Sequence, residues 1–179
     1  MRFSLLDEEE KREYYEVLLS ILKEVDHEFI PALSEREPMI LPWMELEGGD
    51  QTAGSVRAYL EEMYVMEKIL GIFQNGIIVG IVSFLENEKF EILTEADMPN
   101  IYICTVVVSP AARGMGVTKK AYRYLLEELF PDRNFFTRTW STNFAHTKIL
   151  SAMGFREFKR IPDDRGRGID TVYYENRRF

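Results

Sequence analysis

Residues 106 to 118 read VVVSPAARGMGVT, and the run from Lys119 to Leu129 that follows is compatible with a helix. The β-branched start is typical of a buried strand, and a Ser-Pro pair ends it. Gly114 and Gly116 then form a turn at which the backbone can approach a ligand closely. A helix that starts directly after such a turn presents free backbone N–H groups and the positive end of its dipole. The stretch therefore predicts an anion-binding site, with phosphate as the expected ligand.

The same turn has a purely structural interpretation, because strand-to-helix turns often carry glycine. Spacing alone leaves the two interpretations equally open. Arg113 could contact a phosphate oxygen, or it could fix the turn by pairing with a carbonyl. The stretch lacks the Gly-Lys-Ser/Thr of a nucleotide-hydrolysing P-loop, and it lacks the third glycine and the downstream acid of a dinucleotide fingerprint. The spacing therefore argues against ATP and NAD as ligands.

Composition narrows the class of protein. The chain has 179 residues, of which 46% are hydrophobic, and this is enough to bury the core of one compact domain. The formal net charge of −8 argues against nucleic acid or an anionic membrane as a partner, and it mildly favours cationic or amine-bearing partners. A single cysteine, Cys104, fits a reducing compartment. With no signal peptide and no apolar run of about 20 residues, we expect a soluble cytoplasmic protein.

Hydrophobic periodicity and turn residues predict the order of elements. A first helix is predicted with Asp7 as cap and an apolar repeat from Tyr14 to Val25, and further helices from near Ser55, over 117–129 and over 143–153. Strands are predicted over 68–73, 77–85, 101–108, 134–140, 155–161 and 169–174. The first two strands form a hairpin through Asn75-Gly76. Residues 26–50 are expected to be irregular with short helical turns, and residues 86–100 to be a charged loop or a short irregular strand. This order implies an α/β protein with a mixed sheet and helices on both faces.

Two motifs in this order resemble the GNAT superfamily of N-acetyltransferases. Residues 108 to 118 resemble its acyl-CoA signature, Arg/Gln-x-x-Gly-x-Gly/Ala, preceded by a valine strand and a proline. Downstream, Asn143 opens a helix that ends in Met153-Gly154-Phe155, which is similar to a second common feature of the superfamily. The resemblance runs from about Lys68 to Tyr174, and the N-terminal part fits it only loosely.

This resemblance implies one acyl-CoA N-acyltransferase domain over residues 1–179, with a variable helical part over about 1–66 and a cofactor-binding core over about 67–179. It implies a mixed α+β fold whose central, mostly antiparallel sheet has about six or seven strands, with splayed central strands and helices on both faces. Its function would be direct transfer of an acetyl or other acyl group from acetyl-CoA to a primary amine of a small molecule or peptide. The alternative is a catalytically degenerate acyl-CoA-binding sensor or regulatory module. A homodimer stays open as the oligomeric state.

The resemblance also assigns cofactor contacts. Backbone groups of the valine strand would pair with the pantetheine arm, the glycine turn would hold the pyrophosphate, and Asn143 would touch the cofactor. The residues concerned are Val106, Val107, Val108, Arg113, Gly114, Met115, Gly116, Val117, Thr118 and Asn143. Thr118 departs from the final Gly/Ala of the signature, and its hydroxyl could itself bond a phosphate oxygen.

Catalysis is less well defined by the sequence. Many members of the superfamily use a tyrosine as general acid at the position of Leu150, which cannot donate a proton. His146 lies four residues earlier on the same helix face and is the candidate replacement, although a histidine with a satisfied hydrogen bond is the commoner situation. Ser141 and Thr142 are interpreted as helix caps.

Further candidates are weaker. Acids near the hairpin and in the loop after it could accept the amine proton, and no choice among them is made: Glu86, Glu88, Glu91, Glu95 and Asp97. Aromatic residues could line an acceptor pocket, although core packing is the preferred interpretation for most of them: Trp43, Tyr59, Tyr64, Phe90 and Trp140. Cys104 is interpreted as an inert thiol. Without a Cys/His cluster, no metal site is predicted.

Overall fold

The computed structural model describes residues 1–36, 55–87, 89 and 93–178, and the predictions for Trp43, Glu88, Phe90 and Glu91 lie outside these residues. The chain divides into two compact units, which are described separately: residues 1–83 with 107–113, and residues 84–106 with 114–179. No helix among the described residues is long and apolar enough to cross a membrane.

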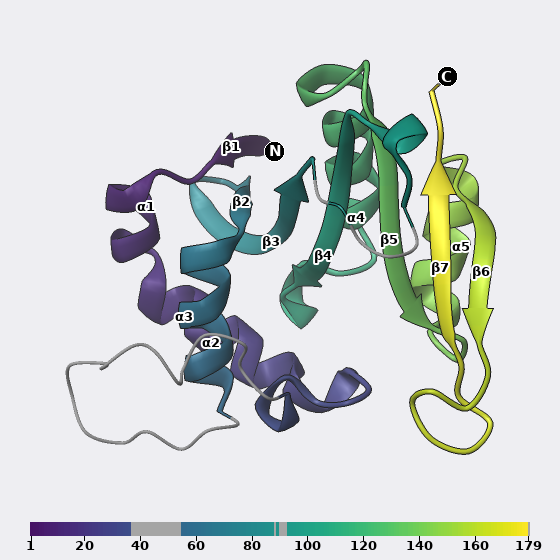
Figure 1. Cartoon of the computed structure of the whole chain (residues 1–179). Coiled ribbons are helices and arrows are strands. Elements are labelled where there is room, and N and C mark those ends of the chain that lie inside the picture. The colour runs from purple at the N-terminus through teal and green to yellow at the C-terminus, as the bar shows by residue number, and fades with distance from the viewer. Residues whose placement is uncertain (37–54, 88, 90–92, 179) are drawn as a thin grey trace. The chain divides into compact units, whose positions relative to one another are not determined.

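Among the residues that the structure describes, seven strands form one sheet in the order β1-β2-β3-β4-β5-β7-β6 (Figure 1). The strands are β1 (Arg2–Leu5), β2 (Lys68–Gln74), β3 (Ile77–Glu86), β4 (Asn100–Val108), β5 (Asn134–Trp140), β6 (Arg156–Ile161) and β7 (Thr171–Asn176). The α-helices are α1 (Glu8–Glu13), α2 (Tyr15–Val25), α3 (Val56–Met66), α4 (Val117–Arg123) and α5 (Phe144–Ala152). Short 3₁₀ turns cover Asp26–Glu28, Leu33–Glu35, Glu95–Asp97 and Pro110–Ala112, and a π-helical segment, Tyr124–Leu129, extends α4.

In the first unit, α1 begins at a capping box. The Asp7 carboxylate accepts the N–H groups of Glu9 and Glu10 at 2.9 and 2.8 Å, and the Glu10 carboxylate accepts the N–H of Asp7 at 3.2 Å. This confirms Asp7 as the cap of the first helical region, which the structure divides at Tyr14 into α1 and α2. The apolar faces of α2 and α3 pack with β2 and β3 around buried residues that include Leu22, Leu60 and Phe73.

The β2–β3 hairpin has the turn that its sequence predicts. Asn75 and Gly76 have φ values of 52° and 81°, as a two-residue turn with left-handed residues requires. Strand β1 was missed by the sequence reasoning. It pairs antiparallel with β2, from Arg2 opposite Phe73 to Leu5 opposite Leu70. Four residues are too short a run for alternation to be recognised.

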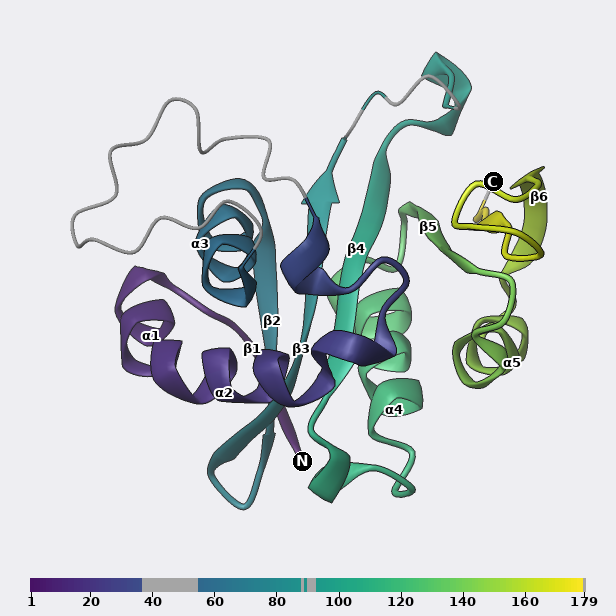
Figure 2. The same cartoon turned by 90° about the horizontal axis from the view of Figure 1, so that it is seen from below.

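In the second unit, β5 pairs in parallel with β4 and antiparallel with β7, and β7 pairs antiparallel with β6. Helices α4 and α5 lie on the same side of these strands, as both views show (Figures 1 and 2). Side chains from the strands and helices fill the layer between them, and Phe135, Leu125 and Leu150 have no exposed surface. A mixed α+β fold with a seven-stranded, mostly antiparallel sheet agrees with the fold class predicted from the sequence.

Strands β4 and β5 separate partway along their length. Their paired residues run from Asn100–Asn134 to Ile103–Thr137, although β4 continues to Val108 and β5 to Trp140. On its other edge β5 remains paired with β7 as far as Trp140 opposite Thr171. The described residues therefore contain the splayed central strands that the sequence resemblance implies.

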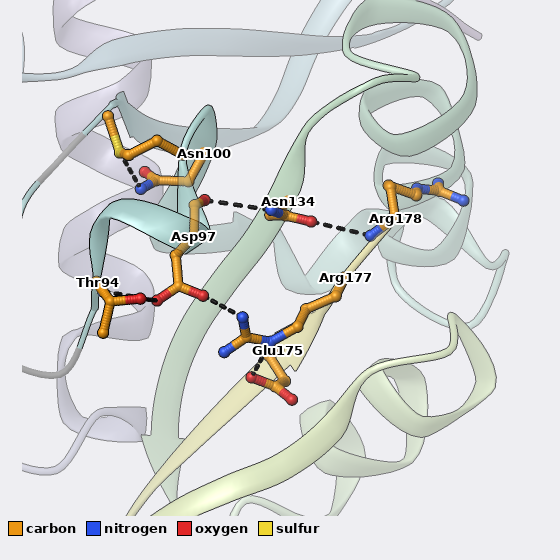
Figure 3. Close-up of polar contacts among 8 residues, drawn as sticks. Thr94, Asp97, Asn100, Asn134, Glu175, Arg177 and Arg178 are labelled. Carbon is orange, nitrogen blue, oxygen red and sulfur yellow. Dashed lines mark hydrogen bonds and ion pairs between the residues drawn. The ribbon is translucent and has the colours of Figure 1, made fainter.

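A polar network ties the chain end to the start of β4 (Figure 3). The buried Asp97 carboxylate accepts the backbone N–H and the hydroxyl of Thr94 at 2.6 and 2.9 Å, and it forms an ion pair with Arg177. The Asn134 side chain donates to the carbonyl of Asp97 at 3.2 Å and accepts the backbone N–H of Arg178 at 2.9 Å. Residues far apart in the sequence thus hold the paired ends of β4 and β5.

Candidate active site

The glycine turn requires both of its glycines. Gly114 and Gly116 have φ values of 79° and 68°, a left-handed conformation that other residues adopt only at an energetic cost. A Cβ at either position would meet nothing within 4 Å. The requirement is therefore one of backbone conformation, and the space beside the turn is open to a ligand.

The start of α4 has the features of an anion site. Gly116 is the N-cap, and no side chain caps the helix. Among the described residues, the first hydrogen bond of this helix runs from the N–H of Lys120 to the carbonyl of Gly116 at 3.0 Å. The N–H groups of the first helical turn, which include those of Val117 and Thr118, have no acceptor within the helix. The buried Val117 side chain fixes this helix end, so these residues fit a phosphate group.

Arg113 belongs to the first unit, where it fixes the turn. Its Nε donates to the carbonyl of Val108 at 3.1 Å, and its guanidinium forms an ion pair with Glu28 at 2.9 Å. Of the two roles that the sequence allowed, pairing with a carbonyl is the one found. In the same unit, a Cβ on Gly80 would lie 2.4 Å from the carbonyl oxygen of Val107, so β3 approaches β4 very closely there.

Val106 belongs to the second unit and lies beyond the last β4–β5 pair. Among the described residues, the edge of Val106 that would face β5 has no partner strand. Main-chain groups at an open strand edge can pair with an extended chain of amides. Pantetheine contains such amides, so this edge suits the contact that the resemblance implies.

Asn143 is the N-cap of α5. Its Oδ1 accepts the N–H of His146 at 3.2 Å, and its Nδ2 donates to the hydroxyl of Thr139 on β5 at 3.2 Å. The prediction that Ser141 and Thr142 cap this helix is wrong, since the Ser141 hydroxyl instead accepts the N–H of Asp170 at 2.9 Å. All three residue types are good caps, and only the helix register decides among them.

His146 pairs with a residue that the sequence reasoning missed. Its Nε2 lies 2.7 Å from the hydroxyl of Tyr122, which comes from α4 and is fully buried. Burial lowers the pKa of His146 to about 4, so its imidazole is neutral at pH 7. No spacing rule links residues 122 and 146; the pair forms because α4 and α5 pack side by side.

Several other candidates have structural contacts. Leu150 is fully buried. Burial alone would raise the pKa of Asp97, but hydrogen bonds from Thr94 and the charge of Arg177 lower it. Glu95 forms an ion pair with Lys89 at 3.2 Å. Asp97 is thus committed to the network of Figure 3 rather than to proton transfer.

Of the aromatic and thiol candidates, some lie in the core and others are half-buried. Tyr59 and Tyr64 pack against the core of the first unit, as expected. Trp140, on β5, is half-buried, and the guanidinium of Arg165 lies over its ring. Cys104 is also half-buried, and its thiol donates to the carbonyl of Tyr102 at 3.5 Å.

Comparisons with known proteins agree with this arrangement. Over 98% of the chain, the fold matches a ribosomal-protein-alanine N-acetyltransferase from Brucella melitensis, with 99% of that chain covered, 16% identity and a TM-score of 0.65. Over 98% of the chain, it also matches an N-acetyltransferase from Staphylococcus aureus Mu50, with 96% of that chain covered, 17% identity and a TM-score of 0.64. Over 99% of the chain, it matches a candidate acetyltransferase from Salmonella typhimurium, solved with its cofactor acetyl-CoA (93% of that chain, 16% identity, TM-score 0.62). No curated protein matches the sequence significantly. The sequence model of the acetyltransferase (GNAT) family matches residues 22–155, and the chain belongs to that family.

Proposed function

We propose that the chain is an N-acetyltransferase that transfers an acetyl group from acetyl-CoA directly to a primary amine. The observation that carries the proposal lies within the second unit: the left-handed Gly114 and Gly116, the uncapped start of α4 that follows them, and the strand edge at Val106 that β5 leaves open. The acetyl-CoA bound by the Salmonella protein supports the choice of acyl donor. We further propose a small-molecule or peptide amine as acceptor and a cytoplasmic location.

The chain would bind acetyl-CoA mainly through its backbone. Main-chain groups of Val106 to Val108 would pair with the pantetheine amides, and N–H groups from Gly114 to Thr118 would bind the pyrophosphate. Asn143 would contribute its side-chain amide from the start of α5. The thioester supplies an activated acyl group, so the main task of the protein is to position a neutral amine against it. A dedicated proton donor is less critical because the leaving group is a thiolate.

One observation favours a second candidate, an acyl-CoA-binding sensor or regulatory module. At the usual position of the general acid stands Leu150, which is fully buried, and the neighbouring His146 is neutral and bonded to Tyr122. Such a protein would retain the cofactor site and lack turnover.

Two measurements on the full chain separate these candidates. Thermal unfolding with and without CoA measures binding, because a ligand that binds only the folded state raises the unfolding temperature. Release of free thiol from acetyl-CoA in the presence of a panel of amines measures transfer. Stabilisation with amine-dependent thiol release supports the transferase, and stabilisation without release from any amine supports the sensor. The absence of any stabilisation would contradict both.

A further inference from the structure

One face of the second unit's strands points away from α4 and α5. Thr139 and Asn176 contact the start and the end of α5 through Asn143 and the carbonyl of Met153, which places them on the helix side. Because side chains alternate along a strand, the neighbouring residues belong to the opposite face. The pairing register gathers Tyr102, Phe136, Arg138, Trp140, Tyr173 and Thr171 on that face.

Two guanidinium groups lie on this face. Arg138 is exposed, stands directly opposite Tyr173 on β7 and hydrogen-bonds to it. Within the described part of the chain, Arg138 forms no ion pair with a carboxylate. Arg165, from the β6–β7 turn, has its guanidinium carbon 5.8 Å from the ring centre of Trp140, and its Nε donates to the hydroxyl of Thr171 at 2.9 Å.

Both positive charges act on the same neighbour. Burial raises the pKa of Tyr102, while the charges of Arg138 and Arg165 each act to lower it. The same register also places Glu175 on this face, opposite Phe136, and its carboxylate pairs with Arg177 at 2.8 Å; Asp164 accepts a hydrogen bond from the hydroxyl of Thr171. Glu175 is thus paired with a different guanidinium, and the positive charges that act on Tyr102 are those of Arg138 and Arg165, although the whole chain has a formal net charge of −8.

The position of Arg138 connects this face to the acyl-transfer chemistry. It is the first residue of β5 after Thr137, where pairing with β4 ends. A guanidinium that no carboxylate already occupies binds a carboxylate ligand well, because its N–H groups match the two oxygens. A carboxylate bound at this point would lie beside the separated strands.

We propose that the acyl acceptor is a small primary amine that also carries a carboxylate, and that Arg138 binds this carboxylate, with Arg165 adding positive charge on the same face. The inference rests on the proposed N-acetyltransferase function. It narrows the cationic or amine-bearing partner that the overall charge favours to an amine whose anionic group determines its orientation.

Matched acceptors and variants test the proposal. Each α-amino acid of a panel is compared with its carboxamide, which keeps the amine and removes the negative charge. For the best substrate pair we expect kcat/KM to be at least about tenfold higher for the carboxylate, and R138Q to lower that value by about 10- to 100-fold while leaving the amide unchanged. R123Q, on the exposed side of α4, removes the same charge as a control and should change neither value.

The unfolding temperature and the KM for acetyl-CoA of R138Q, both expected to match wild type, show that the variant is folded and binds cofactor. Equal activity on amide and carboxylate, or an equal loss on both in R138Q, would overturn the inference. If no amine releases thiol, the proposed transferase fails, and calorimetric titration of the CoA-bound protein with the same pairs then tests the site alone. Carboxylate binding that R138Q abolishes supports the site, and absence of binding overturns it.

Discussion

The Nε2 atom of His146 lies 2.7 Å from the hydroxyl of Tyr122, joining α5 to α4 inside the second unit. Tyr122 has no exposed surface, and its ring also packs edge-to-face on Phe155 with centres 5.7 Å apart. The histidine that the sequence nominates as a proton donor therefore has a structural partner. This relationship determines how the protein should respond to pH and to substitution at His146.

The half-buried His146, whose imidazole lies against Tyr122, should make folding stability depend on pH. Its pKa falls from 6.5 to about 4 on folding, so the unfolded chain binds more protons between these values. The contribution of His146 to stability is therefore complete above pH 6.5 and is lost as the pH falls towards 4, by at most about 3 kcal/mol. Urea unfolding of wild type and His146→Gln from pH 4 to 7 measures it. A wild-type slope that the variant retains in full would assign the effect to other groups.

Turnover should depend only modestly on His146. A neutral imidazole already bonded to Tyr122 is a poor proton donor, so we expect His146→Gln to keep turnover at saturating acetyl-CoA within about tenfold of wild type. Tyr122→Phe serves as the comparison, because it keeps the imidazole and removes its partner. A loss greater than tenfold in His146→Gln, with the unfolding temperature unchanged, would establish His146 as the general acid.

Substituting a glycine of the turn before α4 should weaken the binding of acetyl-CoA. Gly116→Ala forces a side chain into a left-handed conformation and should cost about 1–2 kcal/mol of stability. Because the same change displaces N–H groups at the start of α4, we expect the KM for acetyl-CoA to rise by about tenfold or more. Gly76→Ala is the matched control: its φ of 81° and open surroundings give a similar stability loss in the β2–β3 hairpin, without the change in KM.

The Asp97–Arg177 ion pair should stabilise the fold measurably. The Asp97 side chain is 2% exposed and that of Arg177 is 38% exposed, so the pair is only partly screened by solvent. Asp97→Asn leaves Arg177 without this partner, and we expect a loss of about 2–3 kcal/mol in urea unfolding. Glu95→Gln, which breaks the exposed pair with Lys89, should cost less than about 1 kcal/mol. Equal losses in the two variants would contradict a specific role for Asp97.

Low pH should remove the stabilisation that the Asp97–Arg177 ion pair provides. The pKa of Asp97 is lowered in the folded state, so its stabilisation is present above the pKa of an unfolded aspartate and is lost as the pH falls below it. Wild type and Asp97→Asn should therefore converge in stability at acid pH. A difference that persists unchanged below pH 3 would show that packing, rather than charge, accounts for the loss.

Local sequence signals predicted the features that depend on neighbouring residues. The Asn75-Gly76 hairpin, the Asp7 cap and the glycine turn before α4 each rest on backbone preferences within a few residues, and the structure has all three. The position of β4 in the middle of the sheet followed from its continuous apolar sequence.

Features that depend on packing between distant segments could not be predicted from local sequence signals. The Tyr122–His146 contact, the Asp97–Arg177 pair and the placing of Arg138 opposite Tyr173 each depend on strand register or helix packing. The cap of α5 shows the same limit at short range, since Ser141, Thr142 and Asn143 are all acceptable caps and the helix start selects one.

The most direct test of the account is to incubate the full chain with acetyl-CoA and the amine panel and to follow thiol release together with the mass of the amine. The account predicts CoA release that depends on the amine, with one acetyl group added to the amine nitrogen for each thiol released. Cofactor binding with no acetylated product from any amine would contradict it.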